Sequence, residues 1–195
     1  MNNFFIGEIY VYQVLSILWI LVEIFLIILD IWKNKKLARD HGTLWWLTGC
    51  IIVGFYGSAQ LTVRLTEYNI GIHYFFWILG LADIMIALGI FLRLWVVKKL
   101  GKLFRRVIVA HQDEHVFQNG LYQYIRHPSY LGITLAVTGI VLGWGNIAAI
   151  IFSIATTIAG LYPRIILEEQ YLQEFMPGYS KYINQVKWRL IPLIW

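Results

Sequence analysis

The sequence predicts an all-α integral membrane protein with about five transmembrane helices, the last two of which form a C-terminal helical hairpin. Of its 195 residues, 59% are hydrophobic and only 14% are charged, and the mean hydropathy is +0.64. Soluble domains carry about 25% charged residues. The nine tryptophans also fit the aromatic belts of a membrane protein. The single cysteine, Cys50, excludes an internal disulfide.

Three apolar runs in the first half are long enough to cross a bilayer, which takes about 20 residues. They cover residues 10–32, 43–63 and 74–97. Glu23 and Asp83 lie inside these runs, and because a charge is costly in lipid we expect both to face other helices and hydrogen-bond there. Gly54, Gly57 and Ser58 allow close helix packing in the second run. These runs predict a three-helix membrane anchor over residues 1–97.

The second half contains two shorter apolar stretches, at residues 129–142 and 147–162. The sequence Gly-Trp-Gly-Asn at residues 143–146 separates them and indicates a turn. We therefore expect a helical hairpin that enters the membrane and returns. An amphipathic segment follows from residue 164 to the C-terminus. Residues 101–126 form the longest polar stretch, with a short strand expected at residues 107–109.

The distribution of basic residues predicts the topology. The first and third connections are basic, whereas the second contains a single arginine, Arg64. The basic residues are Lys33, Lys35, Lys36 and Arg39, then Lys98, Lys99, Lys102, Arg105 and Arg106. The positive-inside rule places the N-terminus outside and the C-terminus in the cytoplasm. Five spans satisfy this, and so do three spans with a re-entrant hairpin. The net charge of +5 lies beside apolar runs, which favours anionic membrane lipids over nucleic acid as partners.

A dense polar cluster marks the start of the hairpin. Residues 120–132 read Gly-Leu-Tyr-Gln-Tyr-Ile-Arg-His-Pro-Ser-Tyr-Leu-Gly. Pro128 suits the first turn of a helix, where its missing N–H costs nothing, and the free N–H groups there can bind an anionic or polar ligand. An interfacial anchor is the alternative, with Arg126 extending to the headgroups and the tyrosines in the belt. The density of polar groups favours a functional site.

A second cluster follows the hairpin, in the sequence Arg-Ile-Ile-Leu-Glu-Glu from Arg164 to Glu169. Arg164 and Glu168 are four residues apart and so share one helix face. A surface ion pair, which stabilises little, is the alternative. Because the pair emerges from an apolar helix at the membrane boundary, both residues are functional candidates.

The two clusters together resemble the isoprenylcysteine carboxyl methyltransferases, a family whose wider group includes phospholipid N-methyltransferases. The shared pattern is Gly-x-Tyr-x-x-x-Arg-His-Pro-x-Tyr followed by Arg-x-x-x-Glu-Glu. The resemblance runs from about Glu114 to the C-terminus. It includes Phe175, Tyr179, Tyr182, Arg189 and Pro192, although Met176-Pro177-Gly178 departs from the family's pattern. It implies a catalytic half over residues 98–195, with a cytosolic cofactor-binding segment, inside a single structural domain of residues 1–195.

The resemblance also implies S-adenosylmethionine as the cofactor and a lipid-like or prenylated acceptor. The implied cofactor contacts are Glu114, His115, Val116, Phe117, Tyr122, Arg126, His127, Pro128, Ser129, Tyr130, Glu168 and Glu169. Glu168 would hold the amino acid end of the cofactor, Arg164 would bind the acceptor, and Glu114 stands where the family usually has histidine. A carboxylate acceptor needs no general base, whereas an amine or a phenol-like hydroxyl would need His127 or Tyr130.

Other functions remain open from the sequence. N- or O-methylation of a phospholipid or another lipophilic small molecule would use the same scaffold, as would a nicotinamide-dependent reductase. A non-enzymatic assembly factor or transporter is a further alternative, but the paired broken helices typical of transporters are absent. No metal site is expected at His111 and His127.

Overall fold

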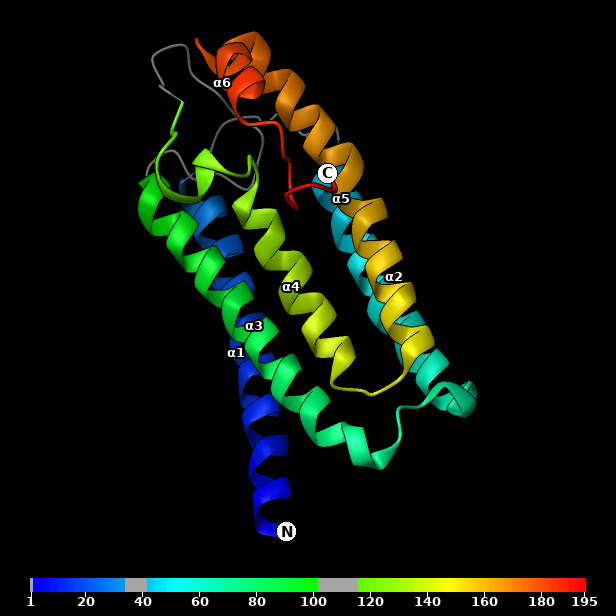
Figure 1. Cartoon of the computed structure of the whole chain (residues 1–195). Coiled ribbons are helices and arrows are strands. Elements are labelled where there is room, and N and C mark those ends of the chain that lie inside the picture. The colour runs from blue at the N-terminus through cyan, green and yellow to red at the C-terminus, as the bar shows by residue number, and fades with distance from the viewer. Residues whose placement is uncertain (1, 34–41, 102–115) are drawn as a thin grey trace.

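The computed structural model describes residues 2–33, 42–101 and 116–195. Within these ranges the predicted all-α fold is confirmed, and the strand expected at residues 107–109 lies outside them. The helices are α1 (Asn2–Lys33), α2 (Thr43–Arg64), α3 (Ile72–Leu100), α4 (Pro128–Leu142), α5 (Ile147–Phe175) and α6 (Tyr179–Gln185) (Figure 1). By length and composition α1, α2, α3 and α5 can each cross a membrane, and α4 is a shorter apolar helix of 15 residues. These helices support a multi-pass membrane protein.

The long helices are arranged in two packed groups. In Figure 1, α4 runs beside α3 and α1, while α2 runs along α5. The turn between α4 and α5 reaches the end of the bundle where α2 connects to α3. There Asn146 forms an isolated β-bridge with Asn69, and its Nδ2 donates to Leu65 O at 2.9 Å and to Asn69 Oδ1 at 2.7 Å. The hairpin therefore runs between the same two ends as α2 and α3.

Small residues bring the packed helices close together. A Cβ added at Gly89 of α3 would lie 2.7 Å from the carbonyl oxygen of Gly132 in α4. One added at Gly54 of α2 would lie 2.5 Å from a threonine hydroxyl of α5. The Ser58 hydroxyl donates to Ala149 O of α5 at 2.9 Å. The small residues of the second apolar run thus serve the close packing that the sequence predicts.

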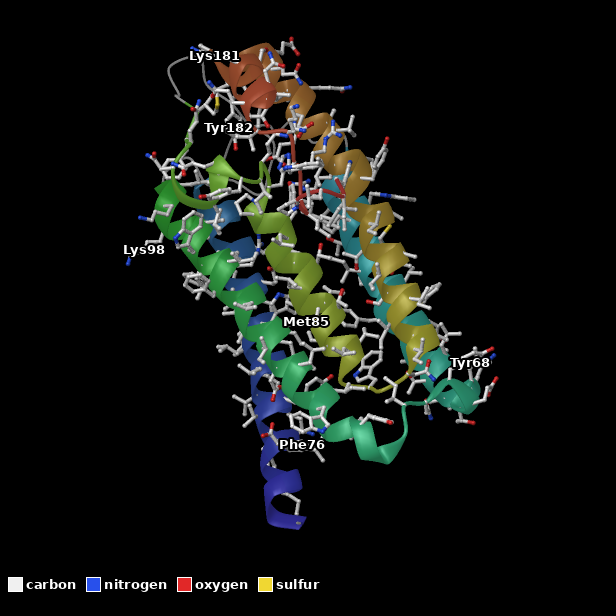
Figure 2. The ribbon with its side chains drawn as sticks, in the orientation of Figure 1. Tyr68, Phe76, Met85, Lys98, Lys181 and Tyr182 are labelled. Carbon is white, nitrogen blue, oxygen red and sulfur yellow. The ribbon has the colours of Figure 1, made fainter. Side chains whose placement is uncertain are left out.

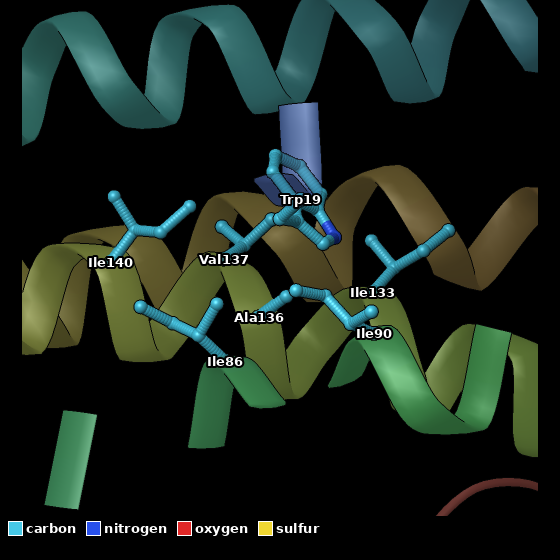
Figure 3. Close-up of a cluster of buried hydrophobic side chains, with 7 residues drawn as sticks. All are labelled: Trp19, Ile86, Ile90, Ile133, Ala136, Val137 and Ile140. Atoms are coloured by element: carbon cyan, nitrogen blue, oxygen red, sulfur yellow. The ribbon is translucent and has the colours of Figure 1, made fainter. Parts of the chain in front are cut away.

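A buried apolar cluster holds α1, α3 and α4 together (Figure 3). It comprises Trp19, Ile86, Ile90, Ile133, Ala136, Val137 and Ile140. Because α4 contributes the last four of these residues, the cluster fixes the helix whose first turn carries the Arg-His-Pro motif.

Helix α5 extends well beyond the apolar stretch that ends at residue 162, because it continues through Pro163 to Phe175. Proline has no N–H to donate to the carbonyl four residues earlier, which belongs to Ala159. The indole N–H of Trp46 in α2 donates to that carbonyl instead, at 3.1 Å. A tertiary hydrogen bond thus replaces the missing helical one, and Arg164 and both glutamates lie on a continuous helix.

Candidate functional site

The site lies at the end of the bundle where α4 begins. Pro128 occupies the first turn of α4, as the sequence predicts. The backbone just before it is held by the C-terminal segment, since Arg126 N donates to Trp188 O and His127 N donates to Arg189 O, both at 2.9 Å. The Arg-His-Pro string is therefore fixed between the start of α4 and the chain's last residues.

Glu169 is the centre of a buried ionic network. Its side chain is 4% exposed, and its Oε1 lies 2.9 Å from Arg126 Nη1 and 3.1 Å from His127 Nε2. Its Oε2 accepts a hydrogen bond of 2.9 Å from Arg189 Nε. Because both oxygens are engaged, Glu169 joins α5 to the motif and to the C-terminal segment. These contacts are those of a structural anchor.

Glu168 has a different environment, although it is the neighbouring residue. It is half-buried, and the Tyr130 hydroxyl donates to its Oε2 at 2.5 Å. Arg164 Nε donates to the same hydroxyl at 2.9 Å, and Arg164 Nη1 donates to Thr43 Oγ1 at 3.2 Å. Tyr130 thus links the arginine and the glutamate that the sequence places on one helix face.

Aromatic side chains line the segment before the motif. Tyr122, in the 3-10 turn Gly120–Gln123, stacks on Trp95 of α3 with ring centroids 6.2 Å apart. Phe117 meets the Tyr122 ring edge-on at 5.5 Å, and the Tyr182 hydroxyl donates to Tyr122 O at 2.7 Å. Burial, and then the nearby Glu168 carboxylate, raise the pKa of the Tyr122 hydroxyl above its ordinary value. Tyr122 therefore stays neutral at physiological pH and offers an aromatic surface.

Ser129, an implied cofactor contact, also has a hydrogen-bond partner within the protein. Its hydroxyl accepts a hydrogen bond from Arg93 Nη1 of α3, and Arg93 also pairs with Glu23 of α1 at 2.6 Å. The interhelical bonding expected of Glu23 is thus observed, whereas Asp83 Oδ1 has no hydrogen-bond partner among the described residues. Arg93 was not among the residues predicted from the sequence. The available signal was an arginine inside the apolar run of residues 74–97.

The remaining predicted residues are only partly described. Val116 packs against the buried cluster of Tyr179, Tyr182 and Val186, whereas Glu114 and His115 lie outside the described residues, as does His111. In the parts of the chain that the structure covers, no group of three or more His, Cys, Asp or Glu residues is placed to hold a metal ion.

The chain is similar to known proteins over most of its length. The model of the isoprenylcysteine carboxyl methyltransferase family matches residues 81–174, from α3 to near the end of α5. The chain is 31% identical over 150 residues to protein-S-isoprenylcysteine O-methyltransferase B of Arabidopsis thaliana, across 72% of this chain and 75% of that relative. It is 26% identical over 166 residues to protein-S-isoprenylcysteine O-methyltransferase of Schizosaccharomyces pombe, across 80% of this chain and 70% of that relative.

Proposed function

The chain belongs to the isoprenylcysteine carboxyl methyltransferase family, and from this we propose that it transfers a methyl group from S-adenosylmethionine to the carboxylate of a prenylated cysteine or a similar lipid-like acceptor. The supporting observation is the contrast between two adjacent glutamates. Glu169 is enclosed in an ionic network, whereas Glu168 is half-buried and is tied through the Tyr130 hydroxyl to Arg164.

The residues around Glu168 fit the methyl donor, which carries an amino acid end with an ammonium and a carboxylate, and an aromatic base. We assign Glu168 to the donor's amino group, and Phe117 and Tyr122 to its apolar and aromatic parts. Arg126 Nε is buried and has no hydrogen-bond partner among the described residues, so a donor carboxylate would satisfy an otherwise costly group. When bound, S-adenosylmethionine supplies a methyl group on a sulfonium, which passes to the acceptor oxygen as the carbon–sulfur bond breaks.

Arg164 is the group that we assign to the acceptor. A carboxylate is already ionised at neutral pH, so the protein needs to align it and exclude water rather than remove a proton. A guanidinium can hold a carboxylate with two parallel hydrogen bonds. Because the Tyr130 hydroxyl contacts both Arg164 and Glu168, one side chain ties the proposed acceptor and donor groups together. The His127 side chain contacts the Glu169 carboxylate and stacks on the Tyr130 ring. These contacts suit a role in holding Tyr130 in place.

We further propose five crossings, with the N-terminus outside and the site facing the cytoplasm, where the water-soluble donor is available. The hairpin runs between the same ends as α2 and α3, which supports counting α4 and α5 as crossings. Figure 2 shows Lys98 and Lys181 at the end that carries the site, and Tyr68 and Phe76 at the other end. In a Cys50→Ser background, we expect an impermeant thiol reagent applied from outside to label Tyr68→Cys but not Lys98→Cys. The reverse pattern would overturn the orientation.

Methyl transfer is tested with purified protein in detergent and labelled S-adenosylmethionine. The acceptor is an S-prenylated cysteine derivative with a free carboxylate, and the matched control is its carboxamide. We expect label to be incorporated only into the acceptor with the free carboxylate. Base should release this label, because base hydrolyses methyl esters. Base-stable label in phospholipid would favour N-methylation, and absence of S-adenosylmethionine binding would contradict the enzyme assignment.

A further inference from the structure

A buried ion pair connects α1 and α3 to the first turn of α4. The Arg93 side chain of α3 is 3% exposed and that of Glu23 in α1 is 13% exposed. Arg93 Nε donates to Glu23 Oε1 at 2.6 Å, and Nη2 donates to Glu23 Oε2 at 2.8 Å. Arg93 Nη1 donates to the Ser129 hydroxyl of α4. One guanidinium therefore joins three helices.

A buried ion pair is by itself weak evidence of a role in stability. A charge within a membrane-spanning helix is costly, and a two-pronged hydrogen bond to a carboxylate offsets that cost. Replacing both members of a buried pair by apolar residues of similar size is nevertheless often neutral or stabilising. The feature that distinguishes Arg93 from a simple interhelical brace is its contact with Ser129.

Arg93 lies directly across the start of α4. A Cβ added at Gly132 would lie 3.2 Å from Arg93 Cγ, so the arginine's aliphatic part passes over Gly132 while its head reaches Ser129. Two residues along α3, Trp95 stacks on Tyr122. The end of α3 thus contacts the predicted cofactor segment on both sides of the Arg-His-Pro string.

We propose that Arg93 is a positioning residue for methyl transfer. Glu23 holds the guanidinium, and the guanidinium fixes the first turn of α4 through Ser129. Tyr130 is the next residue, and its hydroxyl meets both Glu168 and Arg164. Ser129 therefore serves the site by accepting this hydrogen bond. The proposal rests on the proposed methyl transfer, in which a misplacement of about 1 Å can cost about 100-fold in rate.

Two variants distinguish a positioning role of Arg93 from a purely structural one. Ser129→Ala removes the contact to α4 and leaves the ion pair intact, whereas Glu23→Leu with Arg93→Met removes both charges together. For each we expect a thermal midpoint close to wild type. We expect kcat to fall by at least about tenfold, because the reacting groups are misaligned. The affinity for S-adenosylmethionine should stay within about threefold of wild type, since Glu168, Tyr122 and Arg126, which we assign to the donor, are unchanged.

Combining the changes tests whether Arg93 acts through Ser129. Adding Ser129→Ala to the apolar pair should lower kcat no further, because residues that act as a unit are not additive. The matched control is Ser58→Ala, a buried serine that bonds across helices to Ala149 O, for which we expect a normal kcat.

A wild-type kcat in Ser129→Ala would overturn the positioning role, and so would an additive loss in the combined variant. If the apolar pair fails to fold, Ser129→Ala decides alone. Failure of the wild-type protein to bind S-adenosylmethionine would instead overturn the proposed function. The two failures are therefore distinguishable.

Discussion

The adjacent glutamates of α5 are expected to respond in opposite ways to the same isosteric change. Glu169→Gln removes a carboxylate charge that faces Arg126, His127 and Arg189. Arg126 is only 7% exposed, so it is left as a buried charge without its partner, and breaking a buried pair in this way costs about 3–5 kcal/mol. Arg189 contributes less, because its side chain is 30% exposed.

Glu168→Gln should leave the fold almost unchanged, since glutamine can still accept the hydrogen bond from Tyr130. A neutral hydrogen bond differs from the native one by about 1 kcal/mol or less in stability. Affinity for S-adenosylmethionine should fall roughly 10- to 100-fold, as expected for a lost charge-assisted contact worth about 1.5–3 kcal/mol.

Thermal unfolding in one detergent and calorimetry with S-adenosylmethionine, applied to both variants, test the contrast. The expected loss for Glu169→Gln corresponds to a lower midpoint by on the order of 10 °C for a chain of this size. A wild-type midpoint in Glu169→Gln would refute its role as a structural anchor. Normal donor affinity in Glu168→Gln would remove that residue from the proposed donor site.

Three further substitutions are informative. Arg164→Lys should keep donor affinity but lose most of the turnover, because lysine cannot copy the guanidinium's two-pronged geometry; near-normal turnover would exclude Arg164 from the acceptor site. Trp46→Phe should lower stability by about 1 kcal/mol, and adding Pro163→Ala should restore it, because the new backbone N–H then donates to the carbonyl that the indole served; thermal unfolding without that rescue would contradict this account of the helix. Gly89→Ala should cost about 1–3 kcal/mol through overpacking against α4, whereas Gly49→Ala, with no neighbouring atom within 4 Å of the added Cβ, should not, and equal midpoints would argue against close α3–α4 packing.

Much of the fold and part of the site follow from local chain geometry. The lengths of the apolar runs predict the helices, and proline's missing N–H predicts that Pro128 lies in the first turn of α4. The turn at residues 143–146 is equally local, because Asn146 caps α5 by accepting from Ala149 N at 2.9 Å. Helical periodicity also puts Arg164 and Glu168 on one face, and the Tyr130 hydroxyl contacts both.

The sequence by itself therefore determined the membrane class, the approximate helices and the two clusters that carry the family resemblance. Only the tertiary structure decided which glutamate is enclosed, that Ser129 bonds to Arg93, and that α5 continues through Pro163. The physical reason is that periodicity determines which residues share a face, but not what that face meets. Here the partners come from other helices, and the environment that distinguishes Glu168 from Glu169 exists only once the helices pack.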